Sequence, residues 1–180
     1  MRGEQRMKRA NGTTGSRSVV SEDFVSALTD TDLTTLRALV ESEMRNRKIE
    51  FSVGEIGERL VVEYYNSTPG LANLLLAQTG TKNVDALSRA GKRYSIKTVR
   101  RTNKTGTIYP DPDGQENVLF EYLVVARLAP DLSLRSIHEF TWEEFVQIRL
   151  WDRRMSAWYV NCSRKARKRG KCVYERPQDN

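Results

Sequence analysis

Cysteine and histidine are scarce in this chain, which removes several classes of site. Its two cysteines, Cys162 and Cys172, are separated by nine residues in a chain of 180. This spacing fits neither a CxxC zinc-binding pair nor the framework of a disulfide-rich secreted protein, so we expect two free thiols. His138 is the only histidine. A single histidine on a predicted strand is typical of a packed or hydrogen-bonded side chain, which argues against histidine metal sites and Ser-His-Asp triads.

Long apolar runs are also missing. No stretch approaches the roughly 20 apolar residues of a membrane-spanning helix. Residues 1–18 lack the apolar segment of a signal peptide. We therefore expect a cytoplasmic protein with no membrane partner. The length suits one main domain that buries its own core without disulfide or metal support.

Positive charge is plentiful at both ends of the chain. The net charge is +7, and residues 1–20 hold five Lys and Arg against one acid, whereas residues 151–180 hold nine against three. The residues between them carry a net charge of −3. Basic ends suit a polyanionic partner such as nucleic acid, because each Lys or Arg laid on a phosphate releases condensed counterions. Solvated tails are the competing explanation.

Three segments are expected along the chain. Residues 1–20 have almost no large apolar side chain and are interpreted as a flexible basic arm. Residues 21–50 are interpreted as a helical hairpin, with Asp30 or Thr31 capping the second helix and an apolar stripe that serves as a packing face. Residues 51–180 are expected to form a nuclease-like core with a basic C-terminal segment.

The core segment alternates between helix and strand patterns. Ser52 and Glu55 have the spacing of a capping box, so capping rather than metal ligation explains Glu55, and apolar residues repeat at helical intervals until Pro69. Residues 71–77 fit either a helix or a buried strand. Alternating patterns predict further strands, and Thr141 caps a helix that is expected to continue to residue 150. The predicted strands cover residues 83–87, 92–99, 118–128, 132–140, 158–162 and 171–175.

The predicted hairpin at residues 83–99 brings polar side chains together. If it closes symmetrically about Ala90, the numbers of paired residues sum to about 180, so Asp85 faces Ser95. Lys97 is then the diagonal neighbour of Asp85 on the same face, roughly 7–8 Å away between backbones. A carboxylate and an ammonium therefore converge. The opposite face of the second strand carries side chains suited to packing against a helix: Tyr94, Ile96 and Thr98.

These polar side chains suit the hydrolysis of a phosphodiester. The reaction needs an activated water and charge stabilisation, which a divalent ion held by carboxylates and a nearby lysine can supply. Asp85 and Lys97 fit these two roles, and Glu58 adds a second carboxylate from the preceding helix. Gly54 and Gly57 would let that helix approach the sheet closely. A purely structural ion pair of Asp85 with Lys92, Arg93 or Lys97 is the simpler alternative.

A helix bearing an acid, GEIGERLVVEYYN, precedes a strand bearing an aspartate, NVDAL, and a strand ending in lysine, GKRYSIKT. This order of parts, within residues 52–150, resembles the PD-(D/E)xK restriction-endonuclease-like superfamily. The resemblance implies an α/β fold with a restriction-endonuclease-like core, in which a mixed four-stranded sheet is flanked by helices. It also implies DNA cleavage that depends on Mg²⁺, with Mn²⁺ as the alternative ion.

The resemblance extends to individual residues. Glu58 and Asp85 would be metal ligands together with the backbone carbonyl of Ile96. Ser95 departs from the family pattern, which has Asp or Glu at that position. Glu121 on the next strand is a candidate substitute, although an exposed or cross-strand-paired glutamate explains it better. The expected catalytic set is Glu58, Asp85, Lys97 and Ser95.

Two functions from different classes follow. The first is a Mg²⁺-dependent endonuclease acting on double-stranded DNA, in restriction or defence against foreign DNA; RNA or branched DNA as substrate is not separable from it. The second is a catalytically silent DNA-binding module with the same fold. The sequence does not determine the oligomeric state, and a homodimer is one of the possibilities. Basic residues expected to contact phosphates are Arg93, Arg100, Arg101, Lys104, Arg164, Lys165, Arg167, Lys168 and Arg169.

Two expectations concern substitutions at the site. Asp85 and Lys97 are expected to face solvent, so that alanine at either position abolishes cleavage and leaves the thermal midpoint nearly unchanged. A Ser95→Glu change is expected to place a third carboxylate opposite Asp85 and to tighten metal binding, because Lys97 offsets the repulsion.

Overall fold

The computed structural model describes residues 21–48, 52–78, 80–114 and 117–177. The predicted basic arm, residues 1–20, lies outside the described residues. The chain divides into two compact units, Met1–Lys48 and Ile49–Asn180, and each is described by itself. None of the helices in the described ranges is long and apolar enough to cross a membrane.

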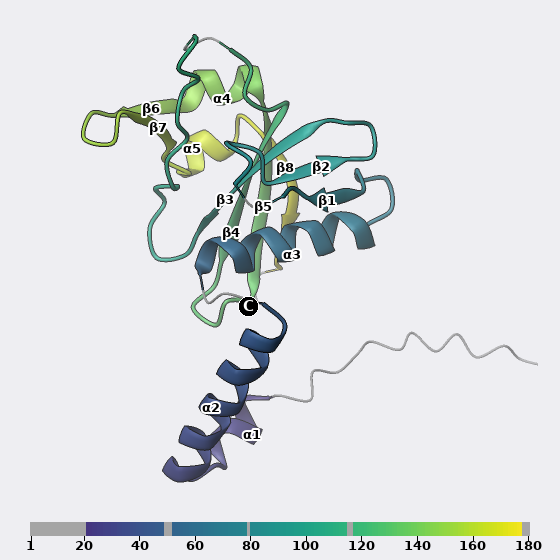
Figure 1. Cartoon of the computed structure of the whole chain (residues 1–180), viewed down its shortest axis with the longest axis vertical. Helices are drawn as coiled ribbons and strands as arrows, with labels where there is room; N and C mark the ends of the chain where they lie inside the picture. The colour runs from purple at the N-terminus through teal and green to yellow at the C-terminus, as the bar shows by residue number, and fades with distance from the viewer. Residues whose placement is uncertain (1–20, 49–51, 79, 115–116, 178–180) are drawn as a thin grey trace, which may run out of the picture. The chain divides into compact units, whose positions relative to one another are not determined.

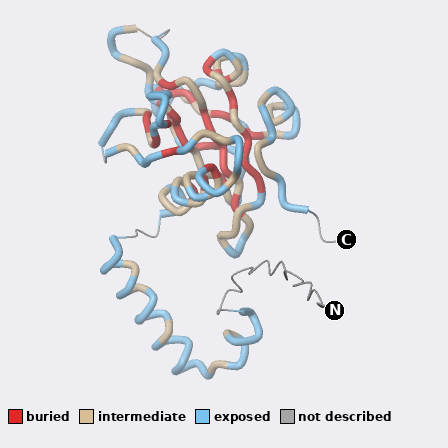
Figure 2. The backbone as a smooth tube through the Cα atoms, turned by 90° about the vertical axis from the view of Figure 1, so that its right-hand side faces the viewer, coloured by how far each residue is buried: buried red, intermediate tan, exposed pale blue. Residues whose placement is uncertain are grey.

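The first unit contains two helices, α1 (Glu22–Ser26) and α2 (Asp30–Asn46). The cap of α2 is Thr29, one residue before the earlier of the two expected positions, because Thr29 and Asp32 form a reciprocal capping box. Neither helix has a buried residue, as the pale blue and tan tube in Figure 2 shows. Leu39 is 63% exposed. The apolar stripe that was expected to be a packing face is therefore not buried.

A six-stranded sheet forms the centre of the second unit (Figure 1). Its order is β1, β2, β3, β4, β5, β8; β3 and β4 run parallel, and the other neighbours run antiparallel. The mixed α/β organisation is confirmed, but the expected number of four strands is wrong, because β1 and β8 extend the sheet at its edges. The strands are β1 (Leu74–Leu76), β2 (Ala86–Ser88), β3 (Arg93–Val99), β4 (Tyr122–Leu128), β5 (Leu134–Thr141) and β8 (Lys171–Glu175).

One segment decides an alternative that the sequence left open, and another differs from the sequence-based expectation. Residues 71–77, which fitted either helix or strand, supply the edge strand β1. The helix capped by Thr141 is present as α4 (Trp142–Ile148), but it ends before residue 150 because the chain turns directly into a hairpin. That hairpin, β6 (Arg149–Asp152) with β7 (Ala157–Val160), forms a separate two-stranded sheet.

The register between β2 and β3 is the one that the sequence predicts. Ala86 pairs with Tyr94 and Leu87 with Arg93, so the paired numbers sum to 180. Asp85 lies immediately before β2, and its N–H donates to the carbonyl of Tyr94 at 2.8 Å. The side chain of Asp85 is thereby fixed at the end of the ladder, opposite the middle of β3.

Helix α3 (Val53–Ser67) covers one face of the sheet (Figure 1). Tyr94 and Ile96 pack into the apolar cluster beneath this helix, which confirms the predicted facing of β3. A Cβ on Gly57 would lie 1.9 Å from Oγ1 of Thr98, so only glycine allows this close approach of helix and strand. A Cβ on Gly54 would meet nothing nearer than 3.8 Å, so the predicted need for glycine holds at Gly57 alone.

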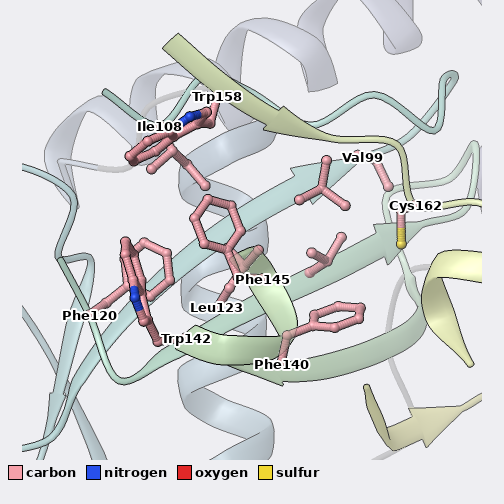
Figure 3. Close-up of a cluster of buried hydrophobic side chains, with 11 residues drawn as sticks. Val99, Ile108, Phe120, Leu123, Phe140, Trp142, Phe145, Trp158 and Cys162 are labelled. Atoms are coloured by element: carbon pink, nitrogen blue, oxygen red, sulfur yellow. The ribbon is translucent and has the colours of Figure 1, made fainter. Parts of the chain in front are cut away.

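An aromatic cluster covers the opposite face. Alternate residues of β4 point to opposite sides of a sheet, and Leu123 and Val125 belong to this second cluster. Figure 3 shows Phe145 and Trp142 of α4 gathered with Trp158 of β7 over these strands. The short helix α5 (Arg164–Arg167) follows β7 and leads into β8. Both cysteines are free, as predicted: Cys162 is buried in this cluster and Cys172 is exposed.

Candidate active site

The carboxylate of Asp85 is the centre of the candidate site. Its Oδ2 accepts three hydrogen bonds, from the backbone N–H of Ile96 at 2.6 Å, from the hydroxyl of Ser95 at 3.1 Å and from Nζ of Lys97 at 3.1 Å. The β2–β3 ladder ends at the pair Ala86–Tyr94, so the Asp85 side chain replaces the next backbone partner of β3. The structure thus brings together the three residues that the hairpin register placed on one face.

This constellation is more buried than expected. The side chains of Asp85 and Lys97 are only 20% and 18% exposed, and Ser95 is 0% exposed. Replacing Asp85 by alanine would leave the Ser95 hydroxyl and the Ile96 N–H without their acceptor, at about 1–3 kcal/mol for each buried group. The premise that Asp85 and Lys97 face solvent is therefore wrong, and we expect Asp85→Ala to lower stability.

The burial of Ser95 also overturns the expected effect of Ser95→Glu. A glutamate there would bring two extra carbons and a charge into a fully enclosed position on β3. Burying a charge without a matched partner is strongly unfavourable. The substitution would test the tolerance of the core rather than the affinity of a metal site.

Glu58 lies close enough to this centre for the charges of Asp85 and Lys97 to shift its pKa. The carboxyl is half-buried on α3, and burial raises its pKa above the ordinary value; the Asp85 carboxylate adds to the rise, and Lys97 opposes it. Glu58 forms no hydrogen bond or ion pair with any described residue. Besides burial, the carboxylates of Asp85 and Glu55 raise the pKa of Glu58, and the cations Lys97 and Arg59 lower it. Three carboxylates therefore stand against two cations, which leaves an excess of negative charge.

Glu55, one turn earlier on α3, does not behave as a capping residue alone. The hydroxyl of Ser52 accepts a hydrogen bond from the Glu55 N–H at 3.1 Å, so half of the expected capping box is present. Oε2 of Glu55 is buried and has no hydrogen-bond partner among the described residues. The charge of Glu55 also contributes to the raised pKa of Glu58.

The backbone carbonyl of Ile96 faces the same edge as the Asp85 carboxylate. The N–H and C=O of one strand residue point to the same side, and the Ile96 N–H is bonded to Asp85. Two carboxylates and a carbonyl are hard oxygen ligands of the kind that Mg²⁺ and Mn²⁺ take. All three hydrogen bonds of the Asp85 carboxylate go to Oδ2, so Oδ1 remains for a further ligand. The residues present therefore fit a divalent cation.

Glu121 does not supply a substitute for the missing acid. It forms an ion pair with Arg93 at 2.7 Å and also accepts the Arg93 backbone N–H at 2.6 Å. The hydrogen bond from the Arg93 side chain is the main cause that lowers the pKa of Glu121 to about 2. The cross-strand pair favoured on sequence grounds is thus present, and the guanidinium of Arg93 is already engaged.

The other basic residues expected to contact nucleic acid fall into distinct groups. Arg100 donates to the carbonyl of Pro130, and Lys104 forms a 2.7 Å ion pair with Asp152, whereas Arg101 is exposed. In the C-terminal run the residues separate onto two hollows. Arg164, Arg167 and Lys168 line one of them, and Lys165 and Arg169 line the other.

One cluster of potential ligands was not predicted. His138, Cys172 and Glu175 place one ligand atom each within 4.8 Å of one another. The pairing of His138 on β5 with Cys172 on β8 brings them together, and β8 was predicted without its partner strand. The packed state expected for His138 is found, since it is 3% exposed, but its Nδ1 has no hydrogen-bond partner among the described residues.

No model of a known protein family matches this chain, and a search of curated proteins finds no similar sequence. The chemistry of the Asp85 site can still be described from its geometry. It offers oxygen ligands for a cation beside a lysine that is held in place by a carboxylate. Such an arrangement can polarise a phosphoryl group and position a water molecule.

Proposed function

We propose that the chain is a Mg²⁺- or Mn²⁺-dependent endonuclease with a PD-(D/E)xK-like core that acts on double-stranded DNA. The observation that carries the proposal is the meeting of Asp85 and Lys97 at 3.1 Å beside the unpaired carboxylate of Glu58. An ion pair formed only for stability would not require a second, half-buried acid. The excess negative charge supports a cation at this point.

The order of the elements supports the same assignment. Helix α3 bears Glu58, Asp85 precedes β2, and β3 carries Lys97 two residues after Ser95. Strand β3 then pairs in parallel with β4, which sets the mixed sheet. The strands β1 and β8 and the β6–β7 hairpin lie outside the part that the resemblance implies. A role in restriction or defence follows from that resemblance and is part of the proposal.

Each residue has a defined task in the proposed reaction. Glu58, Asp85 and the Ile96 carbonyl would hold the cation, which when bound supplies a Lewis acid for the phosphate and lowers the pKa of a water molecule. Lys97 would orient that water and offset charge on the phosphate. Ser95 and the Ile96 N–H hold Asp85 in position through the bonds to Oδ2. The water would then attack phosphorus as the bond from phosphorus to the leaving oxygen breaks. The proton that the water loses would pass through solvent to the leaving alkoxide.

A second candidate is a DNA-binding module that does not cleave. One observation favours it: the hydroxyl of Ser95 occupies the position where the family has a carboxylate, and it is fully buried against Asp85. This arrangement removes one negative ligand from the site. The two candidates share the basic surface and differ only in the outcome of metal addition.

Cleavage of supercoiled plasmid tests the proposal. The purified chain is incubated with Mg²⁺, Mn²⁺ or EDTA, and nicked and linear products are measured. We expect products with either ion and none with EDTA. Asp85→Asn is the matched variant, because an amide oxygen still accepts from Ile96 and Ser95 while the charge is lost. DNA binding without cleavage in both ions would exclude the nuclease and establish the silent module.

A further inference from the structure

A second polar site lies on the same face of the sheet as Lys97. It is an open pocket of about 560 Å³ between β4, β5, β8 and α5. Its register can be followed across the strands, since Lys97 pairs with Val125, Val125 with His138, and His138 with Cys172. Lys97 and His138 are thus two strands apart, about 10 Å between backbones.

The pocket is strongly cationic. One acid, Glu175, lines it, and Nη1 of Arg167 lies 3.8 Å from Oε1 of that acid. The remaining cations are not neutralised by any carboxylate in the described part of the pocket. A concave surface of one charge concentrates the field and attracts counter-ions. The cations that line it are Arg127, Arg135, Arg164, Arg167 and Lys168.

Two polar atoms in the walls of this pocket lack partners. Nδ1 of His138 and Nε of Arg167 are buried and form no hydrogen bond among the described residues. His138 is 3% exposed, and the side chain of Arg167 is 19% exposed. Buried polar groups in folded proteins nearly always have a partner, so each exception calls for an explanation. A bound anion that accepts hydrogen bonds from these groups is one such explanation.

The wall of the pocket is fixed by close packing rather than by loose side chains. A Cβ on Gly170 would lie 2.6 Å from the carbonyl oxygen of Glu139 and 2.5 Å from the ring of Phe140. Glycine therefore lets the turn between α5 and β8 press directly onto β5. This contact holds Arg167 and Lys168 over the sheet from which His138 and Arg135 project.

We propose that this pocket binds a phosphate group. Arginine is suited to the role because its planar fork of donors matches phosphate oxygens, and several guanidinium groups converge here. The proposal goes beyond the nuclease assignment and does not depend on cleavage. The phosphate has two sources with the same chemistry: the terminal phosphate of a nucleic-acid strand, or free phosphate and mononucleotides.

A metal ion is the competing occupant, because His138, Cys172 and Glu175 are close enough to share one. The surrounding charge opposes it. Five Lys and Arg side chains line the same pocket, and a zinc ion would add to that positive charge. Arg167 already approaches the carboxylate that the metal would need. Phosphate relieves this repulsion, whereas a cation increases it.

Calorimetry with inorganic phosphate tests the proposal on the full chain. Arg135→Gln and Lys168→Gln change exposed side chains, so that folding is kept, and each should weaken phosphate binding about tenfold. Arg153→Gln is the matched control, an equal charge change at an exposed site outside the pocket. It should change affinity by less than about twofold. No phosphate binding, or equal weakening by all three variants, would overturn the proposal.

Three further arms separate the sources and the competing ion. A short DNA strand with a 5′-phosphate that binds more tightly than its 5′-hydroxyl form, with the difference lost in Arg135→Gln, identifies a strand terminus. Equal binding of the two strands with tight binding of AMP identifies a small phosphate. Zinc binding that is unaffected by phosphate would replace the proposal with a metal site. Failure of the nuclease proposal appears separately, as absent plasmid cleavage with phosphate binding intact.

Discussion

The Asp85 site and the His138 pocket lie on one face of one sheet, yet their balance of charge is opposite. At Asp85 one carboxylate oxygen receives three donors, and a second carboxylate stands near. In the pocket five cations surround one acid. The Asp85 site is acidic, and the donors around its Oδ2 are hydrogen-bonded. The His138 pocket is basic, and two of its buried nitrogen atoms have no hydrogen-bond partner among the described residues.

This difference indicates what each place requires from outside the chain. An excess of carboxylate attracts a cation, and an excess of guanidinium attracts an anion. A phosphodiester that is polarised by a cation at one point and held by arginine at another fits both requirements. The pairing of opposite charges about 10 Å apart also explains why a net positive chain can hold a carboxylate site.

The largest expected effect is the loss of plasmid cleavage on replacing Lys97, which belongs to the Asp85 site and not to the His138 pocket. Lys97→Met keeps the apolar stem and removes the ammonium that lies 3.1 Å from Asp85. We expect plasmid cleavage to fall about a thousandfold, since loss of a positioned acid–base or electrostatic group has effects of this order. Unfolding free energy should fall by about 1–3 kcal/mol, because both side chains are largely buried and Asp85 loses one charged donor.

Lys92→Met is the control for that experiment, a lysine in the adjacent turn that is exposed. It should retain cleavage. Phosphate binding at the His138 pocket should be the same in Lys97→Met and in the unchanged chain. Full cleavage by Lys97→Met would remove this lysine from the chemistry and reduce the contact with Asp85 to a structural ion pair.

The next effect concerns the position of α3, which carries Glu58. Gly57→Ala places a Cβ 1.9 Å from Oγ1 of Thr98, and overpacking of this kind costs about 1–3 kcal/mol of unfolding free energy. Gly54→Ala has no neighbour nearer than 3.8 Å, so it should stabilise by up to about 1 kcal/mol through helix propensity. Urea unfolding measures both.

The metal and phosphate affinities of the two glycine variants distinguish the Asp85 site from the His138 pocket. Gly57→Ala should weaken Mg²⁺ binding because α3 shifts relative to β3, and it should leave phosphate binding unchanged. Adding Thr98→Ala should recover part of the lost stability, since two of the three nearest atoms are removed. Equal stability changes at the two glycines would contradict the close approach at Gly57.

Local rules predicted much of the site and less of the sheet. Strand alternation and a symmetric turn were enough to place Asp85 against Ser95 and Lys97, because register in a short hairpin is set by the turn. Helix α3 followed from its cap and apolar period. Strand β1 was left open between helix and strand. Strand β8 was predicted at residues 171–175, but its pairing with β5 was not, because this pairing joins segments more than thirty residues apart with no local signal.

Burial was the other property that the sequence did not reveal. Ser95 and Lys97 alternate with apolar residues, a pattern typical of a solvent-facing strand surface, but α4 and the β6–β7 hairpin cover the neighbouring strands. Of that hairpin, the start of β6 was predicted as the end of a helix, whereas β7 was predicted as a strand at residues 158–162. The His138 pocket depends on three strands and the turn at Gly170, so no single motif indicates it.

A smaller effect is expected at Ser95. Ser95→Ala removes one of three hydrogen bonds to Asp85, which should cost about 1 kcal/mol of unfolding free energy. Cleavage should stay within about tenfold, because Lys97 and the Ile96 N–H still hold the carboxylate. Ser88→Ala is the control: its buried hydroxyl accepts from the Lys92 N–H at 3.1 Å and touches no part of the site. Loss of cleavage in Ser95→Ala alone would give the hydroxyl a direct chemical role.

The smallest effect is the pH dependence that Glu58 contributes. Its pKa is raised above 4.5 in the folded chain, first by burial and then by Asp85. At pH values between the ordinary pKa and the raised pKa of the folded chain, the folded state binds more protons than the unfolded state. The contribution of Glu58 to stability therefore falls as pH rises through this range. Glu58→Gln should flatten this part of the urea-unfolding profile, whereas Glu63→Gln, an exposed acid on the same helix, should not.

Mg²⁺ should change that profile in a defined direction if Glu58 is a ligand. The ion binds the ionised carboxylate, so it should stabilise the folded chain more at pH 8 than at pH 5. The dependence should disappear in Glu58→Gln, while phosphate stabilisation of the His138 pocket persists in that variant. A Mg²⁺ effect that is equal at both pH values, or equal in the two glutamate variants, would assign the ion to another site. The Asp85 site would then have no assigned cation, and the His138 pocket would be the one remaining ligand site of the two.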